Sequence, residues 1–333
     1  MSKIKIAING FGRIGRNLFR LLLDHPQIEV VAVNDIADSA TMAHLLKYDS
    51  IHGILDATLA HGPAHIEVNG KKVHYFSARH IAGLDWGSLG IDIVIESTGK
   101  YKSYDEIAAH LESGAKKVIL SAPSETPRIK TVVLGVNESI LDGSDRIVSN
   151  ASCTTNNAAP MIRIIDRLCG IEQAYITTVH SYTTDQSLHD QPHRDLRRAR
   201  AASQSIVPTT TGAAKALNAI FPEMEGKIGG GGIRVPVPDG SLTDITCYVR
   251  REASIDEINK AFREAADGEM KGILAYTQDP IVSVDVIGNR HSCLFDSQLT
   301  SVIGRMVKVV GWYDNEIGYS SRLIDLIPII HNK

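Results

Sequence analysis

The chain has 333 residues, a formal net charge of -3 with histidine neutral, 43% hydrophobic residues and 22% charged residues. This length exceeds the size at which one core keeps growing, so we expect two domains, and the ordinary composition argues against a disordered chain. The slightly acidic balance argues against a protein whose main partner is nucleic acid or an anionic membrane, because such proteins usually carry a basic excess.

The first part of the chain alternates strand-like and helix-like segments. Ile4–Ile8 predicts a strand, Arg13–Leu23 a helix and Val30–Val33 a second strand. Further elements are predicted as strands at Ile91–Glu96, Lys117–Leu120, Thr131–Val136 and Arg146–Ser149, and as a helix at Tyr104–Ser113. This alternation is typical of a mostly parallel, doubly wound sheet.

The pattern changes after Asn150. A predicted helix at Ser152–Leu168 leads into a strand at Tyr175–Val179 and then into a long polar segment, Ser181–Gln204, whose length favours a functional loop. The later elements are predicted as strands at Ile233–Val237, Thr243–Val249, Ile281–Ile287 and Met306–Trp312, and as helices at Ser254–Ala266 and Tyr319–Ile330. We expect an antiparallel-rich second domain, with Pro328 distorting or ending the last helix.

The four cysteines lie far apart and form no CxxC pair. Their spacing predicts neither a disulfide framework nor a metal site, and it favours a reducing compartment. The N-terminus leads directly into the strand at Ile4–Ile8, and no apolar run approaches about 18 residues. We therefore expect no signal peptide and no membrane span, and the predicted location is cytoplasmic.

A glycine motif, Gly-Phe-Gly-Arg-Ile-Gly at residues 10–15, joins the first predicted strand to the first predicted helix. Its glycines permit a tight turn and a close approach to a pyrophosphate, whose charge the helix N-terminus stabilises. Asp35 ends the second strand, where its carboxylate can accept hydrogen bonds from an adenosine ribose. A glycine motif alone is more often a structural turn, but this combination predicts dinucleotide binding.

Cys153 lies where a predicted strand gives way to a predicted helix. A helix N-terminus lowers the pKa of a cysteine, and a nearby imidazole lowers it further, so we expect thiolate character. A small apolar plug is the commoner role of a free cysteine. That role fits Cys169, Cys247 and Cys293, which lie in or beside apolar segments, but not Cys153, which lies among Ser, Thr and Asn. Cys153 is therefore the candidate nucleophile.

His180 is the candidate base among 13 histidines, because it ends a predicted strand and opens the polar segment. The arginines of that segment, together with Arg234, form either a solvated basic surface or a set of donors for phosphate. The turn Thr209–Gly212 adds hydroxyl and N–H donors before a further helix. These donors suffice for two anion sites.

Six ordered motifs extend along the chain, at residues 9–16, 44–50, 151–156, 180–183, 211–216 and 312–316. Through them the chain resembles the glyceraldehyde-3-phosphate dehydrogenase family along nearly its whole length. The resemblance implies an α/β fold with a Rossmann-type doubly wound parallel sheet domain and an α+β catalytic domain with a mostly antiparallel sheet. It implies an NAD-binding domain at residues 1–150 with a C-terminal helix at 315–333, and a catalytic domain at residues 151–314.

The resemblance also implies the functional residues. Cys153 would be the nucleophile and His180 its base, without a metal. The implied cofactor-binding residues are Gly10, Phe11, Gly12, Arg13, Ile14, Asp35, Arg79, Ser121 and Asn315. The implied phosphate-binding residues are Thr183 and Arg234 for the substrate phosphate, Ser152, Thr154, Thr211 and Gly212 for inorganic phosphate, and Arg198 close to both.

The implied activity is the oxidation and phosphorylation of D-glyceraldehyde 3-phosphate to 1,3-bisphosphoglycerate with NAD⁺ and inorganic phosphate. The reaction would proceed through a thioester on Cys153, in a homotetramer without a membrane or dedicated nucleic-acid partner. An alternative enzyme is erythrose-4-phosphate dehydrogenase, which resembles the chain less around Thr183 and Thr211-Gly212. An alternative from another class is a non-enzymatic NAD-sensing or RNA-binding module, which the Cys153–His180 pair disfavours.

Three positions depart from the family pattern. Asn157 replaces a second cysteine four residues after the nucleophile, Pro238-Asp239-Gly240 replaces Pro-Asn-Val, and Ile317 replaces a common tryptophan. We expect the change at Asn157 to affect oxidation behaviour more than turnover. We expect the change at Asp239-Gly240 to affect local loop geometry.

Overall fold

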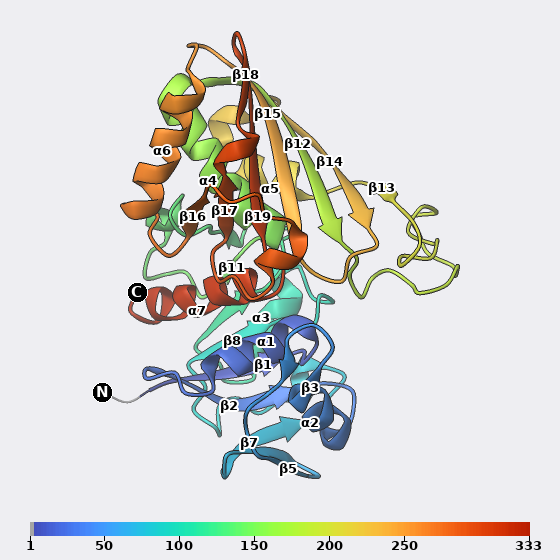
Figure 1. The fold of residues 1–333 in the computed structure, drawn as a ribbon. Coiled ribbons are helices and arrows are strands. Elements are labelled where there is room, and N and C mark those ends of the chain that lie inside the picture. Colours follow the sequence, from blue (N-terminus) through green and yellow to red (C-terminus); the bar gives the residue numbers. More distant parts are fainter. Residues whose placement is uncertain (1–2) are drawn as a thin grey trace. The chain divides into compact units, whose positions relative to one another are not determined.

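The computed structural model describes residues 3–333, and the chain divides into two compact units (Figure 1). Unit 1 comprises the residues through Val132 together with Glu138–Ala151 and Ser320–Lys333. Unit 2 comprises Val133–Asn137 and Ser152–Tyr319. The predicted boundaries, residues 1–150 with 315–333 against residues 151–314, stay a prediction.

Unit 1 is built on one sheet, to which nine strands contribute within the described residues. In sheet order they are β10 (Lys130–Thr131), β11 (Ile147–Ser149), β9 (Lys117–Leu120), β8 (Ile93–Glu96), β1 (Ile4–Asn9), β2 (Ile28–Asn34), β7 (Lys71–Phe76), β6 (His65–Val68) and β5 (Leu59–Gly62). Neighbours from β10 to β7 are parallel, whereas β6 and β5 add an antiparallel edge. The predicted parallel, doubly wound sheet is confirmed.

The helices of unit 1 begin at residues suited to cap them. Asp38 caps α2 (Ser39–Lys47), and Ser103 caps α3 (Tyr104–Glu112) in a reciprocal capping box with Glu106. Helix α1 (Arg13–Leu22) follows the glycine motif directly. A short ladder of β3 (Tyr48–Asp49) and β4 (Gly53–Ile54) follows α2.

Unit 2 is built on a second, mostly antiparallel sheet. Its strands, in sheet order, are β13 (Val207–Thr209), β14 (Ile228–Val235), β12 (Ile171–Ser181), β15 (Ser241–Val249), β19 (Met306–Tyr313), β17 (Cys293–Asp296) and β16 (Leu274–Thr277), with β18 (Ser301–Ile303) beside β19. The pairs β12–β14 and β16–β17 are parallel. The predicted antiparallel-rich catalytic domain is confirmed.

Three helices pack on this second sheet. They are α4 (Cys153–Cys169), which contacts β12, β15 and β19, α5 (Ala213–Ile220), which contacts β14, and α6 (Ile255–Asp267), which contacts β16. Burial alternates along most of β15, as expected when one face of a strand covers a core and the other does not. The core therefore lies between the sheet and α4, whose first residue is Cys153.

Two predicted strands are wrong. At Thr131–Val136 only the first residue belongs to a strand, because Gly135 adopts φ 78° and the Asn137 side chain accepts a hydrogen bond from the Val133 N–H at 2.8 Å. At Ile281–Ile287 the chain forms a short 3₁₀ helix, Ser283–Val286, since the Asp285 carboxylate accepts from the Val282 N–H at 2.8 Å. In both places a local side chain binds the backbone and competes with a sheet.

The hairpin of β6 and β7 was outside the predicted elements, although its sequence signal is clear. Asn69 and Gly70 connect the two strands with φ values of 51° and 79°. Left-handed residues of this kind form the tight turns that match the twist of a hairpin, and Asn-Gly is their preferred sequence.

The last helix, α7, spans Ile317–His331 and continues past Pro328. Pro328 therefore does not end it. Three helical residues follow the proline, and the proline carbonyl accepts from the Asn332 N–H at 3.2 Å. Across residues 3–333, no helix is long and apolar enough to span a membrane.

A buried polar network joins the carboxyl ends of three strands in unit 1. Trp86 Nε1 donates to His110 Nδ1 at 2.9 Å, so the other ring nitrogen, Nε2, carries the proton and faces Glu96 Oε2 at 3.0 Å. Asn9 donates to the same carboxylate at 2.6 Å and accepts from Asn34 at 2.7 Å. These side chains fix the ends of β8, β1 and β2 relative to one another.

We predict that Trp86→Phe lowers the free energy of unfolding by about 1–3 kcal/mol. The substitution keeps an aromatic ring against Phe76, but it removes the N–H that His110 Nδ1 accepts. Urea denaturation followed by far-UV circular dichroism measures the change. A stability equal to that of the parent protein would contradict a structural role for the network.

Candidate functional site

A cavity of about 470 Å³ opens in unit 1 beyond the carboxyl ends of β1, β2 and β8. Ligands of doubly wound sheets bind at this edge. Of the cofactor-binding residues predicted from sequence, four line the cavity, namely Gly10, Gly12, Asp35 and Arg79. The cavity therefore lies where the glycine motif predicts a dinucleotide.

The three glycines of this motif are suited to their positions for different structural reasons. Gly10 adopts φ 95°, and a Cβ there would lie 2.5 Å from the Thr98 nitrogen. A Cβ at Gly15 would lie 2.3 Å from the Gly10 oxygen. A Cβ at Gly12 would meet nothing within 4 Å, and this exposed residue caps α1 without a side chain. The open space at the helix N-terminus fits a pyrophosphate.

Asp35 is held at the edge of the cavity by backbone donors. Its Oδ2 accepts from the Phe11 N–H at 2.8 Å, and its Oδ1 accepts from the Ala37 N–H at 3.2 Å. A carboxylate has about four acceptor positions, so two remain for hydroxyl donors. This arrangement fits a ribose.

The other cofactor residues predicted for unit 1 do not line the cavity. Phe11 is fully buried, Ile14 and Ser121 are half-buried, and Arg13 forms an ion pair with Asp49. The structure adds residues that the sequence interpretation omitted. Among these, Asn34 bonds both the N–H and the carbonyl of Ala78, the residue before Arg79. Its position directly before Asp35, at the end of a strand, was the available signal.

In unit 2, Cys153 and His180 lie in contact, with the sulfur 3.5 Å from Nε2. Cys153 is the first residue of α4, and Ser152 caps that helix by accepting from the Thr155 N–H at 3.1 Å. His180 lies one residue before the end of β12. Ala151 precedes the cap with φ 56°, a strained conformation for alanine.

Burial changes the expected titration of this pair. It raises the pKa of the Cys153 thiol, and the lowering effects of Arg234 and the Thr154 N–H do not offset it. The predicted lowering of the cysteine pKa is therefore wrong for the free site. Burial, aided by the Arg234 charge, lowers the pKa of His180 to about 3. Both groups are neutral at pH 7, so His180 is able to accept a proton.

Arg234 and the Ser181 carbonyl compete for His180 Nδ1. Nδ1 lies 2.8 Å from the Ser181 oxygen and 2.7 Å from Arg234 Nη1, which itself donates to the same oxygen at 2.8 Å. When Nδ1 carries the proton and donates to Ser181, Nε2 is a base toward Cys153. When Arg234 donates to Nδ1, the Nε2 proton faces the sulfur.

The predicted phosphate donors Thr183 and Arg198 gather around Asp185, a residue that the sequence interpretation omitted. Both side chains donate to its carboxylate, and Arg198 also donates to Thr209 at 3.0 Å. Burial opposes ionisation of Asp185, but Thr183, Arg234 and Arg198 together hold its pKa below the ordinary value. The neighbouring Arg197 is exposed. The structure thus supports Arg198 as the arginine of this group.

The remaining predicted anion residues lie at helix starts. Thr154 is in the first turn of α4, and its hydroxyl bonds Tyr313 at 2.9 Å. Gly212 caps α5, a Cβ there would meet nothing within 4 Å, and Thr211 accepts from the Ala213 N–H at 3.2 Å. An open helix N-terminus of this kind suits an anion.

Two of the three departures from the family pattern have a structural explanation. Asn157 is buried and donates to the carbonyls of Ser292 and Trp312 at 3.3 and 3.2 Å. Gly240 adopts φ 83°, and a Cβ there would lie 2.2 Å from the Ser283 oxygen, so glycine suits this loop. Nothing in the structure explains Ile317.

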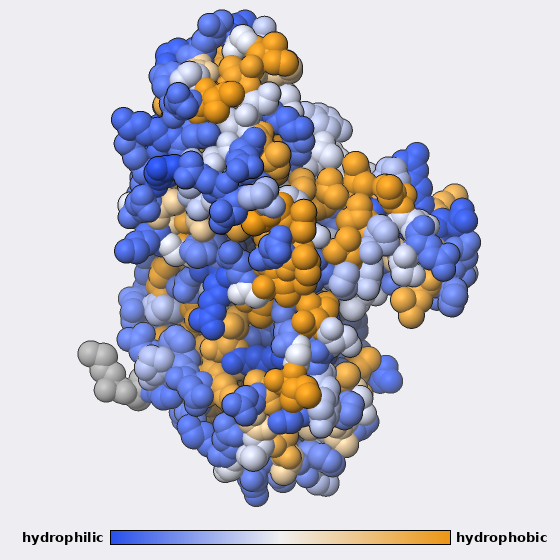
Figure 2. Space-filling model, viewed as in Figure 1, coloured by the Kyte–Doolittle hydropathy of each residue, from blue (hydrophilic) through white to orange (hydrophobic). Residues whose placement is uncertain are grey.

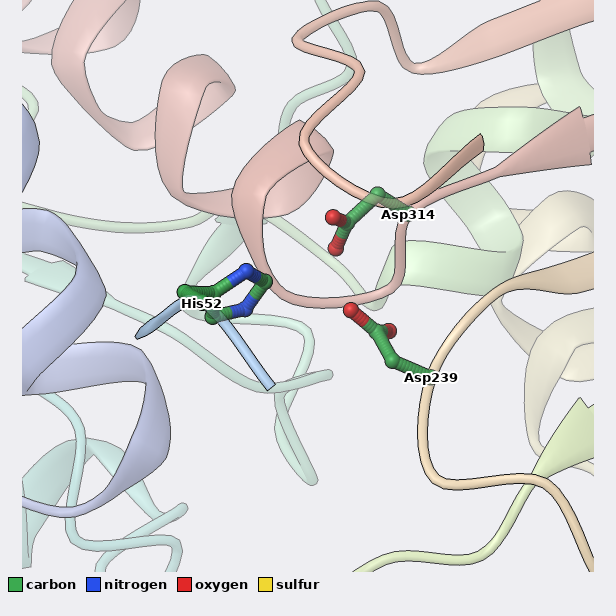
Figure 3. A group of neighbouring side chains, drawn as sticks. All are labelled: His52, Asp239 and Asp314. Atoms are coloured by element: carbon green, nitrogen blue, oxygen red, sulfur yellow. The ribbon is translucent and has the colours of Figure 1, made fainter. Parts of the chain in front are cut away.

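Asp239 and Asp314 form a buried carboxyl pair (Figure 3). Asp314 accepts hydrogen bonds from the N–H groups of Gly288, Glu316 and Ile317 at 2.7–2.8 Å. Burial, with the charges of Asp314 and Glu316, raises the pKa of Asp239 to about 8. His52, also labelled in Figure 3, belongs to unit 1 and is not assigned to this pair.

Two family models match the chain. The model "Glyceraldehyde 3-phosphate dehydrogenase, NAD binding domain" matches residues 4–104, and "Glyceraldehyde 3-phosphate dehydrogenase, C-terminal domain" matches residues 152–315. Similar curated proteins include glyceraldehyde-3-phosphate dehydrogenase 2 of Streptomyces avermitilis, 53% identical over 333 residues, and glyceraldehyde-3-phosphate dehydrogenase of Geobacillus stearothermophilus, 52% identical over 332 residues. Glyceraldehyde-3-phosphate dehydrogenase 1 of Bacillus subtilis is 50% identical over 332 residues. Each alignment covers 99% of both chains.

We predict that Asp239→Asn stabilises the protein more as pH rises. The folded protein keeps the Asp239 proton up to about pH 8, whereas the ordinary aspartate value is 3.8. The free energy of unfolding of the parent is therefore not reduced by Asp239 below about pH 4, and it falls between about pH 4 and pH 8 as this carboxyl loses its proton. The amide variant does not titrate and lacks this fall. Differential scanning fluorimetry should show a Tm difference that grows from pH 5 to pH 8 and then levels off. A Tm difference that does not change with pH would contradict the raised pKa of Asp239.

Proposed function

Since the chain belongs to the glyceraldehyde-3-phosphate dehydrogenase family, whose members are NAD-dependent, we propose that it oxidises its aldehyde through a thioester on Cys153. The observation that carries this proposal is the 3.5 Å contact between Cys153 Sγ and His180 Nε2 at the start of α4. The activity itself is the NAD-dependent, phosphorylating oxidation of D-glyceraldehyde 3-phosphate.

The first step is attack of the Cys153 sulfur on the aldehyde carbon. As the S–C bond forms, the thiol proton passes to His180 Nε2, which is neutral and therefore able to accept it. The resulting negative oxygen is stabilised by the protonated imidazole and by N–H groups at the start of α4.

The second step converts this adduct to the thioester. His180 returns its proton to the oxygen and then accepts the hydroxyl proton again as hydride leaves the carbon. When bound, NAD⁺ supplies the hydride acceptor. Inorganic phosphate then attacks the thioester and the C–S bond breaks. The leaving Cys153 sulfur takes back the proton that His180 holds, and the acyl phosphate is the product.

The cofactor is proposed to bind through the residues that line the cavity of unit 1. Asn315 is assigned to the cofactor by family resemblance alone. Gly10 and Gly12 leave space for the pyrophosphate, and Asp35 accepts from the ribose. Phe11, Arg13, Ile14, Arg79 and Ser121 complete the assignment by family resemblance.

The phosphate groups are proposed to bind at two positions. Thr183 and Arg234 hold the substrate phosphate, while Ser152, Thr154, Thr211 and Gly212 hold the attacking phosphate. Arg198 serves both. The clustering of Thr183 and Arg198 around a carboxylate supports the first position, because a phosphate engages the same donors. The open N-terminus of α5 supports the second.

The assembly and location are proposals from the family as well. We propose a homotetramer in the cytoplasm. Figure 2 shows hydrophobic residues gathered over the β12–β15 region of unit 2, and Tyr175 and Tyr248 on these strands are exposed. Such a surface favours contact with another chain. Sedimentation equilibrium would test the assembly, and the mass of a single chain would overturn it.

No specific observation favours the two alternatives. Erythrose-4-phosphate dehydrogenase would share Cys153 and His180, but the three relatives named above are all glyceraldehyde-3-phosphate dehydrogenases. A non-enzymatic NAD-sensing or RNA-binding module would leave the contact between Cys153 and His180 without a role.

We predict that Cys153→Ser abolishes phosphorylating turnover while NAD⁺ affinity stays within about twofold of the parent, because a hydroxyl lacks thiolate nucleophilicity. His180→Asn should retain more activity, with a loss of about 10²–10⁴-fold. Initial rates of NADH formation and NAD⁺ titrations measure both effects. Activity of Cys153→Ser within tenfold of the parent would rule out the covalent mechanism.

We predict a strong preference for NAD⁺ over NADP⁺. A carboxylate accepts from the ribose 2′-hydroxyl, but it repels a 2′-phosphate by about 1–4 kcal/mol at about 4 Å. The ratio of kcat/KM for the two cofactors measures this preference, and Asp35→Gly should reduce it. A ratio near one in the parent, unchanged in Asp35→Gly, would show that Asp35 does not select the cofactor.

A further inference from the structure

Glu96 is the centre of the buried polar network at the carboxyl end of β8 in unit 1. It is 0% exposed, and each of its carboxyl oxygens has two contacts. Oε1 lies 2.9 Å from the Thr98 backbone nitrogen and also contacts the Thr98 hydroxyl. Oε2 lies 2.6 Å from Asn9 Nδ2 and 3.0 Å from His110 Nε2. A carboxylate has about four acceptor positions, so these contacts use all of them.

The neighbours of Glu96 determine that its contacts are donors. Trp86 donates to His110 Nδ1 at 2.9 Å, so the ring proton is on Nε2 and faces Glu96. The Lys100 N–H donates to the Thr98 hydroxyl at 3.1 Å, so that hydroxyl has its own proton free for Glu96. The backbone N–H of Thr98 can only donate. Three donors are therefore fixed on the β8 side of the network.

The fourth donor, Asn9, is fixed from residue 78. The Ala78 N–H donates to Asn34 Oδ1 at 2.9 Å, and the Ala78 carbonyl accepts from Asn34 Nδ2 at 3.1 Å. This pairing sets the direction of the Asn34 amide, whose Nδ2 also donates to Asn9 Oδ1 at 2.7 Å. The amide nitrogen of Asn9 therefore faces Glu96. The hydrogen bonds extend without interruption from Ala78 to Glu96.

This network reaches the lining of the cavity in unit 1 at two places. Asn34 and Ala78 line it beyond β2 and β7, and Thr98 lines it beyond β8. Strand β1 lies between β2 and β8 in the sheet, so these two places flank Asn9 at the end of β1. Glu96 contacts lining residues on both sides but does not belong to the lining itself.

We propose that Glu96 is a positioning residue, which holds the Asn34–Ala78 side and the Thr98 side of the cavity in the arrangement that receives the adenosine part of the dinucleotide. The proposal rests on the proposed function, which assigns this cavity to the cofactor. Glu96 touches neither the cofactor nor the reacting atoms. It acts before binding, because only the fraction of the free protein whose cavity is correctly arranged binds the cofactor.

Glu96→Gln tests this role with a side chain of nearly the same shape. The NH₂ group of glutamine would face two donors, so one side of the cavity must turn away. NAD⁺ should bind about tenfold more weakly by isothermal titration calorimetry on the full-length protein, as expected when the competent fraction falls to about a tenth. KM for NAD⁺ should rise, while kcat and KM for the aldehyde stay within about twofold of the parent. Loss of folded protein alone would lower kcat and leave KM unchanged.

Val94→Ala is the matched control. Val94 lies on β8 two residues before Glu96, is 0% exposed and belongs to the apolar core of unit 1. Side chains alternate along a strand, so it shares the face of Glu96. Its truncation lowers the stability of unit 1 without removing a hydrogen bond from the network. NAD⁺ affinity should equal that of the parent, and weakening equal to that of Glu96→Gln would overturn the positioning role.

Thr98→Val provides a second test at an exposed position, where a substitution is tolerated more readily. It removes the hydroxyl that donates to Glu96 and leaves the N–H contact in place. NAD⁺ should bind about threefold more weakly, and the change should add nothing to Glu96→Gln, because both act through the same contact. Additive effects would contradict a shared role. If Glu96→Gln does not fold, unchanged NAD⁺ affinity of Thr98→Val overturns the proposal.

Gly12→Val separates failure of this inference from failure of the proposed function. A Cβ at Gly12 meets nothing within 4 Å, so valine fits the fold but occupies the space proposed for the pyrophosphate. If Gly12→Val binds NAD⁺ as the parent does, the cavity is not the cofactor site and the proposed assignment fails. If Gly12→Val weakens NAD⁺ binding and Glu96→Gln leaves it within about twofold of the parent, only the positioning role is overturned.

Discussion

His180 Nε2 lies 3.5 Å from Cys153 Sγ, and two elements of unit 2 hold this contact. One partner is held by the N-terminus of α4, whose apolar face is buried against the sheet. The other is held by β12, which is paired on both sides. Parallel pairing with β14 puts Arg234 in register with His180. The same strand pairing that positions the base therefore also places the Arg234 guanidinium beside His180 Nδ1.

Burial then determines the chemistry of the pair. Since it disfavours both charged forms, Cys153 and His180 start neutral, and the sulfur becomes nucleophilic as its proton moves to Nε2. The resulting opposite charges are adjacent, and their attraction opposes the cost of burial. In unit 1, burial likewise imposes a cost on polar side chains that lack hydrogen-bond partners. The pairing of Glu96 with His110 and Asn9 satisfies groups that would otherwise be costly to bury.

The parts of this structure that the sequence predicts best depend on short-range signals. The strand, glycine motif and helix at the start of the chain are confirmed, since each is specified within a few residues. The predicted strand at Ile281–Ile287 is wrong because Asp285 binds the backbone locally, an effect that an apolar pattern does not contain. The placement of Asp185 between Thr183 and Arg198 depends on how the loop after β12 folds. The raised pKa of Cys153 likewise depends on burial, which the helix-start signal does not report.

A thioester intermediate leaves the acyl group on Cys153 until phosphate attacks, so single-turnover mass spectrometry can detect it. The parent protein is mixed with D-glyceraldehyde 3-phosphate and NAD⁺ without inorganic phosphate, then quenched in acid. The thioester mechanism predicts one NADH per site and a mass increase of one phosphoglyceroyl group on Cys153. Hydroxylamine should remove this group, and Cys153→Ser should not acquire it. Formation of one NADH per site in the parent while Cys153 stays unmodified would contradict the thioester mechanism.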